Sequence, residues 1–166
     1  MNGTLTAKGF KYKNPKTGIL ALGTGAFSPV SSGCTYDTAS GNGQGFLHSS
    51  GSCDYHANVS LPHGARITRV RWSYDTVSTV GDATLRLEAN NDLSSGGGGT
   101  DLVQLNADEA CTETPCIAND SSVPTAAGVN PVNNTNRHYT LYLEATGGSF
   151  RWSKVLVYYT ARTPGT

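Results

Sequence analysis

The chain has few charged residues, and its charges cancel. Asp, Glu, Lys and Arg make up only 14% of the 166 residues, and the formal net charge at pH 7 is zero. A solvated helical protein needs charged exposed faces, so this composition argues against that class. A domain that binds nucleic acid or an anionic membrane surface needs a basic balance, which the chain does not have.

Long apolar runs and helical patterns are also missing. No window approaches the roughly 18 apolar residues of a membrane-spanning segment. No stretch places apolar side chains at i, i+3 and i+4 between capping residues. The four histidines are dispersed, and neither G-x-S-x-G nor H-E-x-x-H occurs. We therefore expect a chain without helices and without a recognisable catalytic motif.

What the sequence does contain is short stretches in which apolar and polar residues alternate. Two such stretches flank Gly147-Gly148 within Tyr139–Tyr159. This pattern predicts a β-hairpin with one buried face. The same rule predicts further strands at Tyr55–Leu61, Ala65–Tyr74 and Thr84–Ala89, and short apolar stretches predict strands at Ile19–Leu22, Phe46-Leu47 and Leu102–Leu105.

Strands separated by turns, without helices, indicate an all-β fold. We expect an antiparallel β-sandwich of jelly-roll or Greek-key type, with about 7–9 strands and long Gly/Ser-rich loops. At this length the chain is most simply one domain, which we assign to residues 17–166. Residues 1–16 are then an N-terminal arm, extended or disordered.

In two strands the apolar residues change between odd-numbered and even-numbered positions, and this shift of parity predicts β-bulges. The apolar residues of 65–67 and of 70–74 differ in parity, so one extra residue near Thr68-Arg69 would turn both sets toward the core. A similar shift within Phe150–Tyr159 predicts a second bulge at Ser153-Lys154.

Parity also divides the aromatic residues. Trp72, Tyr74 and Trp152 are expected in the core, where aromatic side chains dominate the packing of sandwiches. Tyr142 and Tyr158 alternate with the apolar, inward residues of their own strand segments, so we expect them to face outward as a pair across the hairpin. An exposed aromatic pair is typical of a ligand platform or a subunit contact.

The cysteines favour two disulfides. Four are present, and sequence alone allows three pairings. The short spacing C-T-E-T-P-C favours Cys111 with Cys116, which leaves Cys34 with Cys53. The alternatives are free thiols or a zinc site, for which the chain offers Cys34, His48, Cys53 and His56. Disulfides indicate an extracellular or cell-surface protein, and we then expect that a signal peptide has been removed, because the first residues lack the apolar core of one.

A calcium site is an alternative to a protein without cofactors. Four residues with oxygen-bearing side chains flank the run of four glycines in sequence. They are Glu88, Asn90, Asp92 and Asp101. The spacing is not that of an EF-hand, and Asn-Asp-Gly clusters are usually plain turns. We therefore expect no cofactor, with calcium as the weaker hypothesis.

Several segments resemble a group of uncharacterised exported bacterial proteins with a single β-sandwich domain. They are Phe27-Ser28-Pro29, L-P-H-G-A-R-I-T at Leu61–Thr68, A-T-L-R-L at Ala83–Leu87 and the closing aromatic segment. The resemblance covers most of the chain from Phe27 onward. It implies a β-sandwich and an exported location, and it brings no catalytic residue.

The functional hypothesis from sequence is a non-catalytic exported protein that assembles with copies of itself, as a surface, filament or homo-oligomer subunit. The expected interface consists of Phe10 and Tyr12 in the arm, which could add a strand to a neighbour, with Tyr142 and Tyr158. The first alternative is a carbohydrate-binding module that uses exposed aromatic residues, with or without calcium. A hydrolase of unknown type is the third.

Overall fold

The computed structural model describes residues 14–32, 34, 36–39, 46–50, 52–76, 82–91, 99–107, 111, 115–124, 129–146 and 149–162. These residues form eleven strands and one 3-10 turn, η1 (Thr24–Ala26). The strands are β1 (Lys16–Gly23), β2 (Ser28–Pro29), β3 (Tyr36–Ala39), β4 (Phe46–Ser50), β5 (Cys53–Asn58), β6 (Arg66–Thr76), β7 (Asp82–Asn91), β8 (Thr100–Asn106), β9 (Cys116–Asp120), β10 (Arg137–Thr146) and β11 (Ser149–Ala161).

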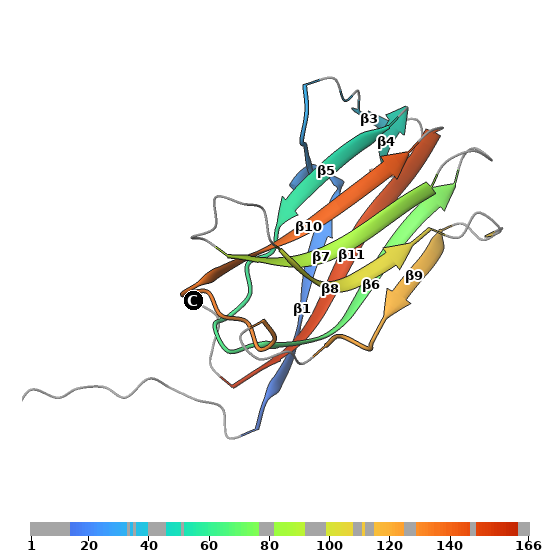
Figure 1. The fold of residues 1–166 in the computed structure, drawn as a ribbon. Coiled ribbons are helices and arrows are strands. Elements are labelled where there is room, and N and C mark those ends of the chain that lie inside the picture. Colours follow the sequence, from blue (N-terminus) through green and yellow to red (C-terminus); the bar gives the residue numbers. More distant parts are fainter. Residues whose placement is uncertain are drawn as a thin grey trace, which may run out of the picture.

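The strands form two antiparallel sheets that lie face to face (Figure 1). Sheet A has the order β3-β4-β11-β6-β9, with β1 also paired to β11. Sheet B has the order β2-β5-β10-β7-β8. The predicted all-β sandwich is confirmed. The expected strand number is too low, because β2, β3 and β9 are only 2, 4 and 5 residues long and too short to show alternation.

The predicted closing hairpin is wrong. β10 pairs with β5 and β7 in sheet B, whereas β11 pairs with β4, β6 and β1 in sheet A. Each strand has one buried face because each lies on the shared core, and alternation reports that burial without identifying the hydrogen-bonded neighbour. The chain therefore crosses from one sheet to the other between residues 146 and 149. Gly147-Gly148 itself lies outside the described residues.

Both predicted bulges are confirmed. The register of β6 against β11 skips Thr68 on one strand and Ser153 on the other. The Thr68 hydroxyl donates a hydrogen bond to the carbonyl of Tyr158 at 3.3 Å, and the Ser153 hydroxyl donates to the carbonyl of Ser73 at 3.3 Å. Each extra residue thus supplies a side-chain bond where the backbone ladder is interrupted.

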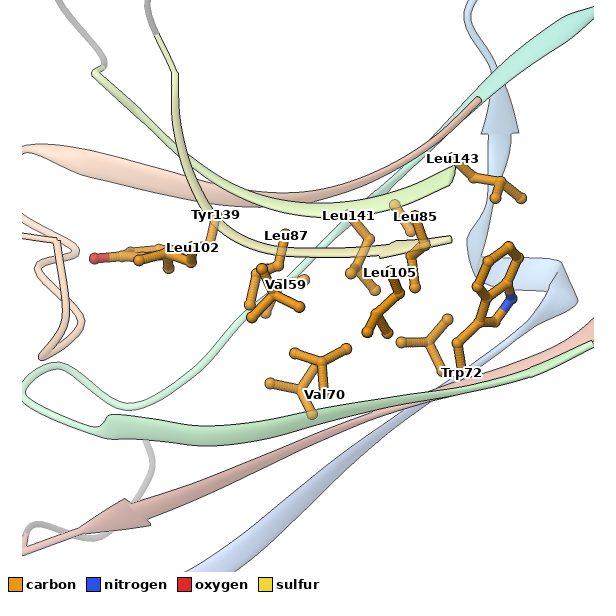
Figure 2. Packing of buried hydrophobic residues seen from close by; sticks show 14 of the residues in the cluster. Val59, Val70, Trp72, Leu85, Leu87, Leu102, Leu105, Tyr139, Leu141 and Leu143 are labelled. Atoms are coloured by element: carbon orange, nitrogen blue, oxygen red, sulfur yellow. The ribbon is translucent and has the colours of Figure 1, made fainter. Parts of the chain in front are cut away.

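The core lies between the sheets and contains the large aromatic residues. Trp72 and Trp152 are 0% exposed and Tyr74 is 1% exposed, as parity predicts. Figure 2 shows Val70 and Trp72 of sheet A facing the leucines of β7 and β10. Because both tryptophans are buried, neither is available to a ligand at the surface.

A buried asparagine connects the segment before β10 to β6. Asn130 is 1% exposed. Its Oδ1 accepts a hydrogen bond from the Ile67 N–H at 3.0 Å, and its Nδ2 donates to the carbonyls of Ile67 at 3.1 Å and Pro124 at 3.0 Å. These bonds satisfy backbone groups beside the Thr68 bulge, where strand pairing is irregular.

Both predicted disulfides form. Cys34 pairs with Cys53 with Cα atoms 5.4 Å apart, and Cys111 pairs with Cys116 with Cα atoms 6.1 Å apart. The zinc hypothesis is therefore wrong, because Cys34 and Cys53 form a disulfide and offer no thiolate to a metal ion. The disulfides fit a protein of an oxidising compartment such as the cell exterior. The part of the chain that the structure describes contains no helix long and apolar enough to cross a membrane.

Candidate ligand-binding face

The outer surface of sheet B is a grid of polar side chains. We call it face B and define it as the outward side chains of β5, β10, β7 and β8. Strand register places one row across its middle, consisting of His56, Tyr142, Arg86 and Gln104. The adjacent row consists of Asp54, Glu144, Thr84 and Asn106. Tyr142 is the only Phe, Trp or Tyr among the described outward residues of this sheet.

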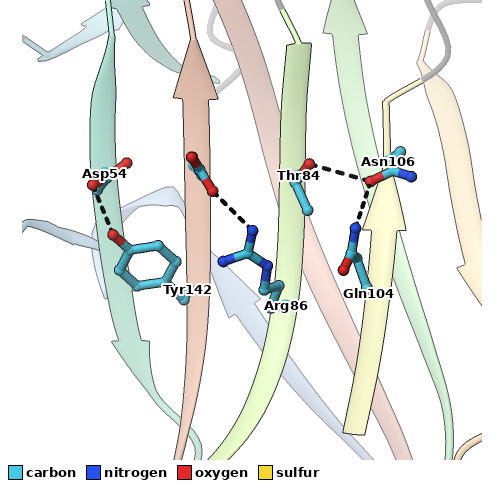
Figure 3. A network of polar contacts seen from close by, with 7 residues as sticks. Asp54, Thr84, Arg86, Gln104, Asn106 and Tyr142 are labelled. Atoms are coloured by element: carbon cyan, nitrogen blue, oxygen red, sulfur yellow. Dashed lines mark hydrogen bonds and ion pairs between the residues drawn. The ribbon is translucent and has the colours of Figure 1, made fainter. Parts of the chain in front are cut away.

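Two contacts join these rows diagonally (Figure 3). The Tyr142 hydroxyl donates a hydrogen bond to Asp54 Oδ2 at 2.7 Å. Arg86 Nη2 forms an ion pair with Glu144 Oε2 at 3.0 Å, and the two side chains are 31% and 38% exposed. A partly exposed pair of this kind contributes little to stability. Its main effect is to hold two charged side chains in one geometry.

Amide and hydroxyl groups continue the network toward β8. The Thr84 hydroxyl donates to Asn106 Oδ1 at 3.2 Å, and Gln104 Nε2 donates to the same oxygen at 3.3 Å. Both donors use one atom of Asn106, so these contacts leave its amide NH₂ for another acceptor.

Tyr142 stays protonated and oriented. Burial raises the pKa of its hydroxyl to about 12, and the hydrogen bond to Asp54 and the charges of Asp54, Glu144 and Glu88 act in the same direction. The hydroxyl therefore remains a donor to Asp54 throughout the physiological pH range. In Figure 3 the ring lies between β10 and β5 with its face toward the viewer.

Face B has a hollow near each end. One, of about 450 Å³, is lined by residues that include Asn58 and His138. The other, of about 310 Å³, is lined by residues that include Thr84 and Asn106. From His138 to Glu144 the strand extends roughly 20 Å, and Figure 2 shows the strands of sheet B bowing toward the core. An elongated surface of fixed donors, acceptors and one aromatic ring suits an extended ligand rich in hydroxyl groups.

The predicted interface residues are not brought together. Tyr142 lies on face B, whereas Tyr158 lies on the outer surface of sheet A, where the Arg69 guanidinium carbon is 3.9 Å from its ring centroid. The predicted aromatic pair across a hairpin is therefore wrong, since the two strands belong to different sheets. Phe10 and Tyr12 lie outside the described residues.

Sequence reasoning missed the polar partners of Tyr142. Arg86 and Glu144 lie at outward positions of predicted strands, and Asp54 directly precedes the strand predicted at Tyr55–Leu61. Their alternation with apolar residues was the available signal. That signal is weak, because outward polar residues are the ordinary composition of an exposed sheet face.

The calcium candidates are only partly assembled. Glu88 and Asp101 are register partners on β7 and β8, and the Asn90 side chain lies against Gly99. Asp92 falls outside the described residues. Within the residues that the structure describes, no three His, Cys, Asp or Glu side chains are grouped so that they could hold a metal ion.

Comparisons with known proteins support the fold. No protein-family model and no curated protein sequence matches the chain. A xylan-binding module, CBM15, is similar in structure with a TM-score of 0.53 and 12% sequence identity, over 89% of this chain and 100% of that one. A low-affinity xylan-binding module, CBM86, from Roseburia intestinalis has a TM-score of 0.47 and 9% identity, over 84% of this chain and 93% of that one. At these identities the likeness to the CBM15 module concerns the β-sandwich fold alone.

Proposed function

We propose that this protein is a non-catalytic carbohydrate-binding module that holds a polysaccharide chain along face B. The observation that carries the proposal is the oriented ring of Tyr142 within a grid of polar side chains, between two hollows. This proposal places glycan binding ahead of self-assembly, because the outward tyrosines that favoured a shared interface lie on opposite surfaces.

The chemistry of a sugar matches the groups on face B. The C–H surface of a pyranose stacks on an aromatic ring, and its hydroxyls both donate and accept hydrogen bonds. Tyr142 uses Oδ2 of Asp54, and Arg86 uses Oε2 of Glu144. The other oxygen of each carboxylate is left by these contacts to accept a hydrogen bond from a ligand hydroxyl.

Xylan is the first ligand to test. The CBM15 module, which shares the fold, is described as xylan-binding, and an extended neutral chain fits a surface about 20 Å long. Only one aromatic platform is present on the described part of face B, so we expect modest affinity.

The test compares two tyrosines on opposite surfaces. Soluble xylan and xylo-oligosaccharides are titrated into the wild type, Tyr142→Ala and Tyr158→Ala, with and without calcium. We expect Tyr142→Ala to weaken binding at least tenfold, which corresponds to about 1.4 kcal/mol. Tyr158→Ala should bind like the wild type. Equal losses in the two variants would contradict the location on face B, and a wild type that binds no polysaccharide on a glycan array would refute the function.

Self-association is the second candidate, favoured by a different observation. β1 pairs only with β11 among the described strands, and Ile19 on it is 56% exposed. An edge strand with an exposed apolar residue is a template for pairing with another copy. Light scattering over a range of concentrations tests this. Ile19→Lys should reduce any association, and a wild type that stays monomeric at every concentration removes the hypothesis.

A further inference from the structure

The outer surface of sheet A carries arginines instead of a mixed polar grid. We call this surface face A and define it as the outward side chains of β6 and β11. Arg66, Arg69 and Arg71 follow one another along β6, over roughly 15 Å. Their register partners on β11 are the uncharged residues Thr160, Tyr158 and Leu156.

A hollow lies at the end of this row. Its volume is about 430 Å³, and its lining residues are Pro15, Gly64, Arg66, Pro131, Thr160 and Arg162. Two guanidinium groups therefore border one concave site, and none of the six lining residues is acidic. Two arginines around a hollow are suited to a carboxylate, which each of them can hold through two parallel hydrogen bonds.

Arg69 and Arg71 extend the positive surface beyond the hollow. The Arg69 guanidinium lies over the Tyr158 ring, 3.9 Å from its centroid, and this contact holds the plane of its donors. Arg71 Nε is buried without a hydrogen-bond partner among the described residues. Among the described residues, the ion pair that forms is Arg86–Glu144 on the opposite surface. It therefore does not neutralise Arg69 or Arg71.

Three acidic residues lie on the strands of sheet A, namely Asp37 on β3, Asp75 on β6 and Asp120 on β9. Strand register places Asp37 and Asp75 in one row with His48 and Arg151, at the opposite end of β6 from Arg66, so Arg151 is not part of the arginine row. Asp120 on the neighbouring strand β9 accepts two hydrogen bonds from Ser122, from its backbone N–H at 2.7 Å and its hydroxyl at 2.6 Å. Among the described residues, the row of Arg66, Arg69 and Arg71 therefore has an excess of positive charge, although the formal net charge of the chain is zero.

We propose that face A, together with the hollow at the end of its arginine row, is a second binding site, specific for the carboxylate groups of an acidic, uronate-bearing polysaccharide. One carboxylate binds in the hollow between Arg66 and Arg162, and another binds at Arg69 and Arg71. A linear polymer is favoured because the arginines lie in a row along one strand. The choice of a polysaccharide over an acidic protein rests on the proposed function of face B.

The experiment measures two ligands on variants of both faces. Polygalacturonate and neutral xylan are titrated at the same ionic strength into the wild type and two double variants, Arg66→Gln/Arg162→Gln and Arg69→Gln/Arg71→Gln. We expect each double variant to lose at least tenfold in affinity for polygalacturonate and to keep its xylan affinity within twofold. Arg86→Gln, which removes a charge from face B, should lose xylan affinity instead. Thermal unfolding verifies that each variant is folded.

The outcomes separate this inference from the proposed function. Unchanged polygalacturonate affinity in both double variants overturns the site, as does a loss no larger than that of Arg86→Gln, which would indicate a general charge effect. Poly-glutamate that binds as tightly and depends on the same arginines also overturns it, because the occupant is then an acidic peptide. A wild type that ignores xylan but binds polygalacturonate through these arginines supports face A and refutes xylan as the ligand of face B.

Discussion

Replacing Tyr142 by Phe removes one hydroxyl and keeps the ring. The hydroxyl lies 2.7 Å from Asp54 Oδ2, and a hydrogen bond to a charged group contributes about 1.5–3 kcal/mol. Tyr142 is only half-buried, so water replaces part of the lost interaction. We expect Tyr142→Phe to lower the free energy of unfolding by about 1 kcal/mol at pH 7.

The same contribution should disappear at alkaline pH. The pKa of Tyr142 is raised from 10.0 to about 12 in the folded state. Below pH 10 both the folded and the unfolded states keep the proton, so the stabilisation is fully present. Between pH 10 and about 12 the unfolded state loses the proton while the folded state retains it, and stability falls. The raised pKa corresponds to about 2.7 kcal/mol at most, and partial exposure reduces this to about 1 kcal/mol.

Urea unfolding, followed by tryptophan fluorescence from pH 7 to pH 12, measures both effects. The wild type should be more stable than Tyr142→Phe up to pH 10, and the difference should close by about pH 12. Tyr158→Phe is the control, because Tyr158 contacts Arg69 through its ring, and it should change stability by less than about 0.5 kcal/mol. A Tyr142→Phe variant as stable as the wild type, or a difference independent of pH, would refute the role given to this hydroxyl.

Two further predictions concern stability. Asn130→Ala should lower the free energy of unfolding by about 2–4 kcal/mol, because it leaves buried backbone groups, including the N–H and carbonyl of Ile67, without partners. Urea unfolding measures this change, and a decrease below about 1 kcal/mol contradicts the prediction. Gly18→Ala should lower the free energy of unfolding by about 1–3 kcal/mol, because a β-carbon at Gly18 would overlap the Cζ and hydroxyl of Tyr159. Gly23→Ala on the same strand is the control, because a β-carbon there meets nothing within 4 Å. Equal free energies of unfolding for Gly18→Ala and Gly23→Ala would contradict the predicted clash.

Local pattern was sufficient for much of this fold. Alternation identified the long strands and their buried faces, since a period of two depends only on neighbours in sequence. Parity shifts located the bulges at Thr68 and Ser153, and the short spacing of Cys111 and Cys116 indicated the disulfide pairing. The strand at Cys116–Asp120 was missed, because its five residues lie within a long polar segment.

The candidate surfaces were less accessible to sequence reasoning. Tyr142 was identified by its outward parity, but Asp54 is 88 residues away in sequence and its contact with Tyr142 depends on the pairing of β5 with β10. Arg66 and Arg162 border one hollow only because the start of β6 lies beside the end of β11. A net charge of zero likewise does not show that the arginines gather on one face.

By itself, the sequence determined that this protein is built from strands with one apolar face and that its tryptophans are buried, and it favoured disulfides over free thiols or a zinc site. These properties follow from short-range periodicity and spacing. Only the tertiary structure decided which sheet each strand joins, and it placed β10 and β11, and with them Tyr142 and Tyr158, on opposite layers. The physical reason is that either sheet of a sandwich buries the same kind of strand face, so strand partners are selected by contacts between residues far apart in the chain.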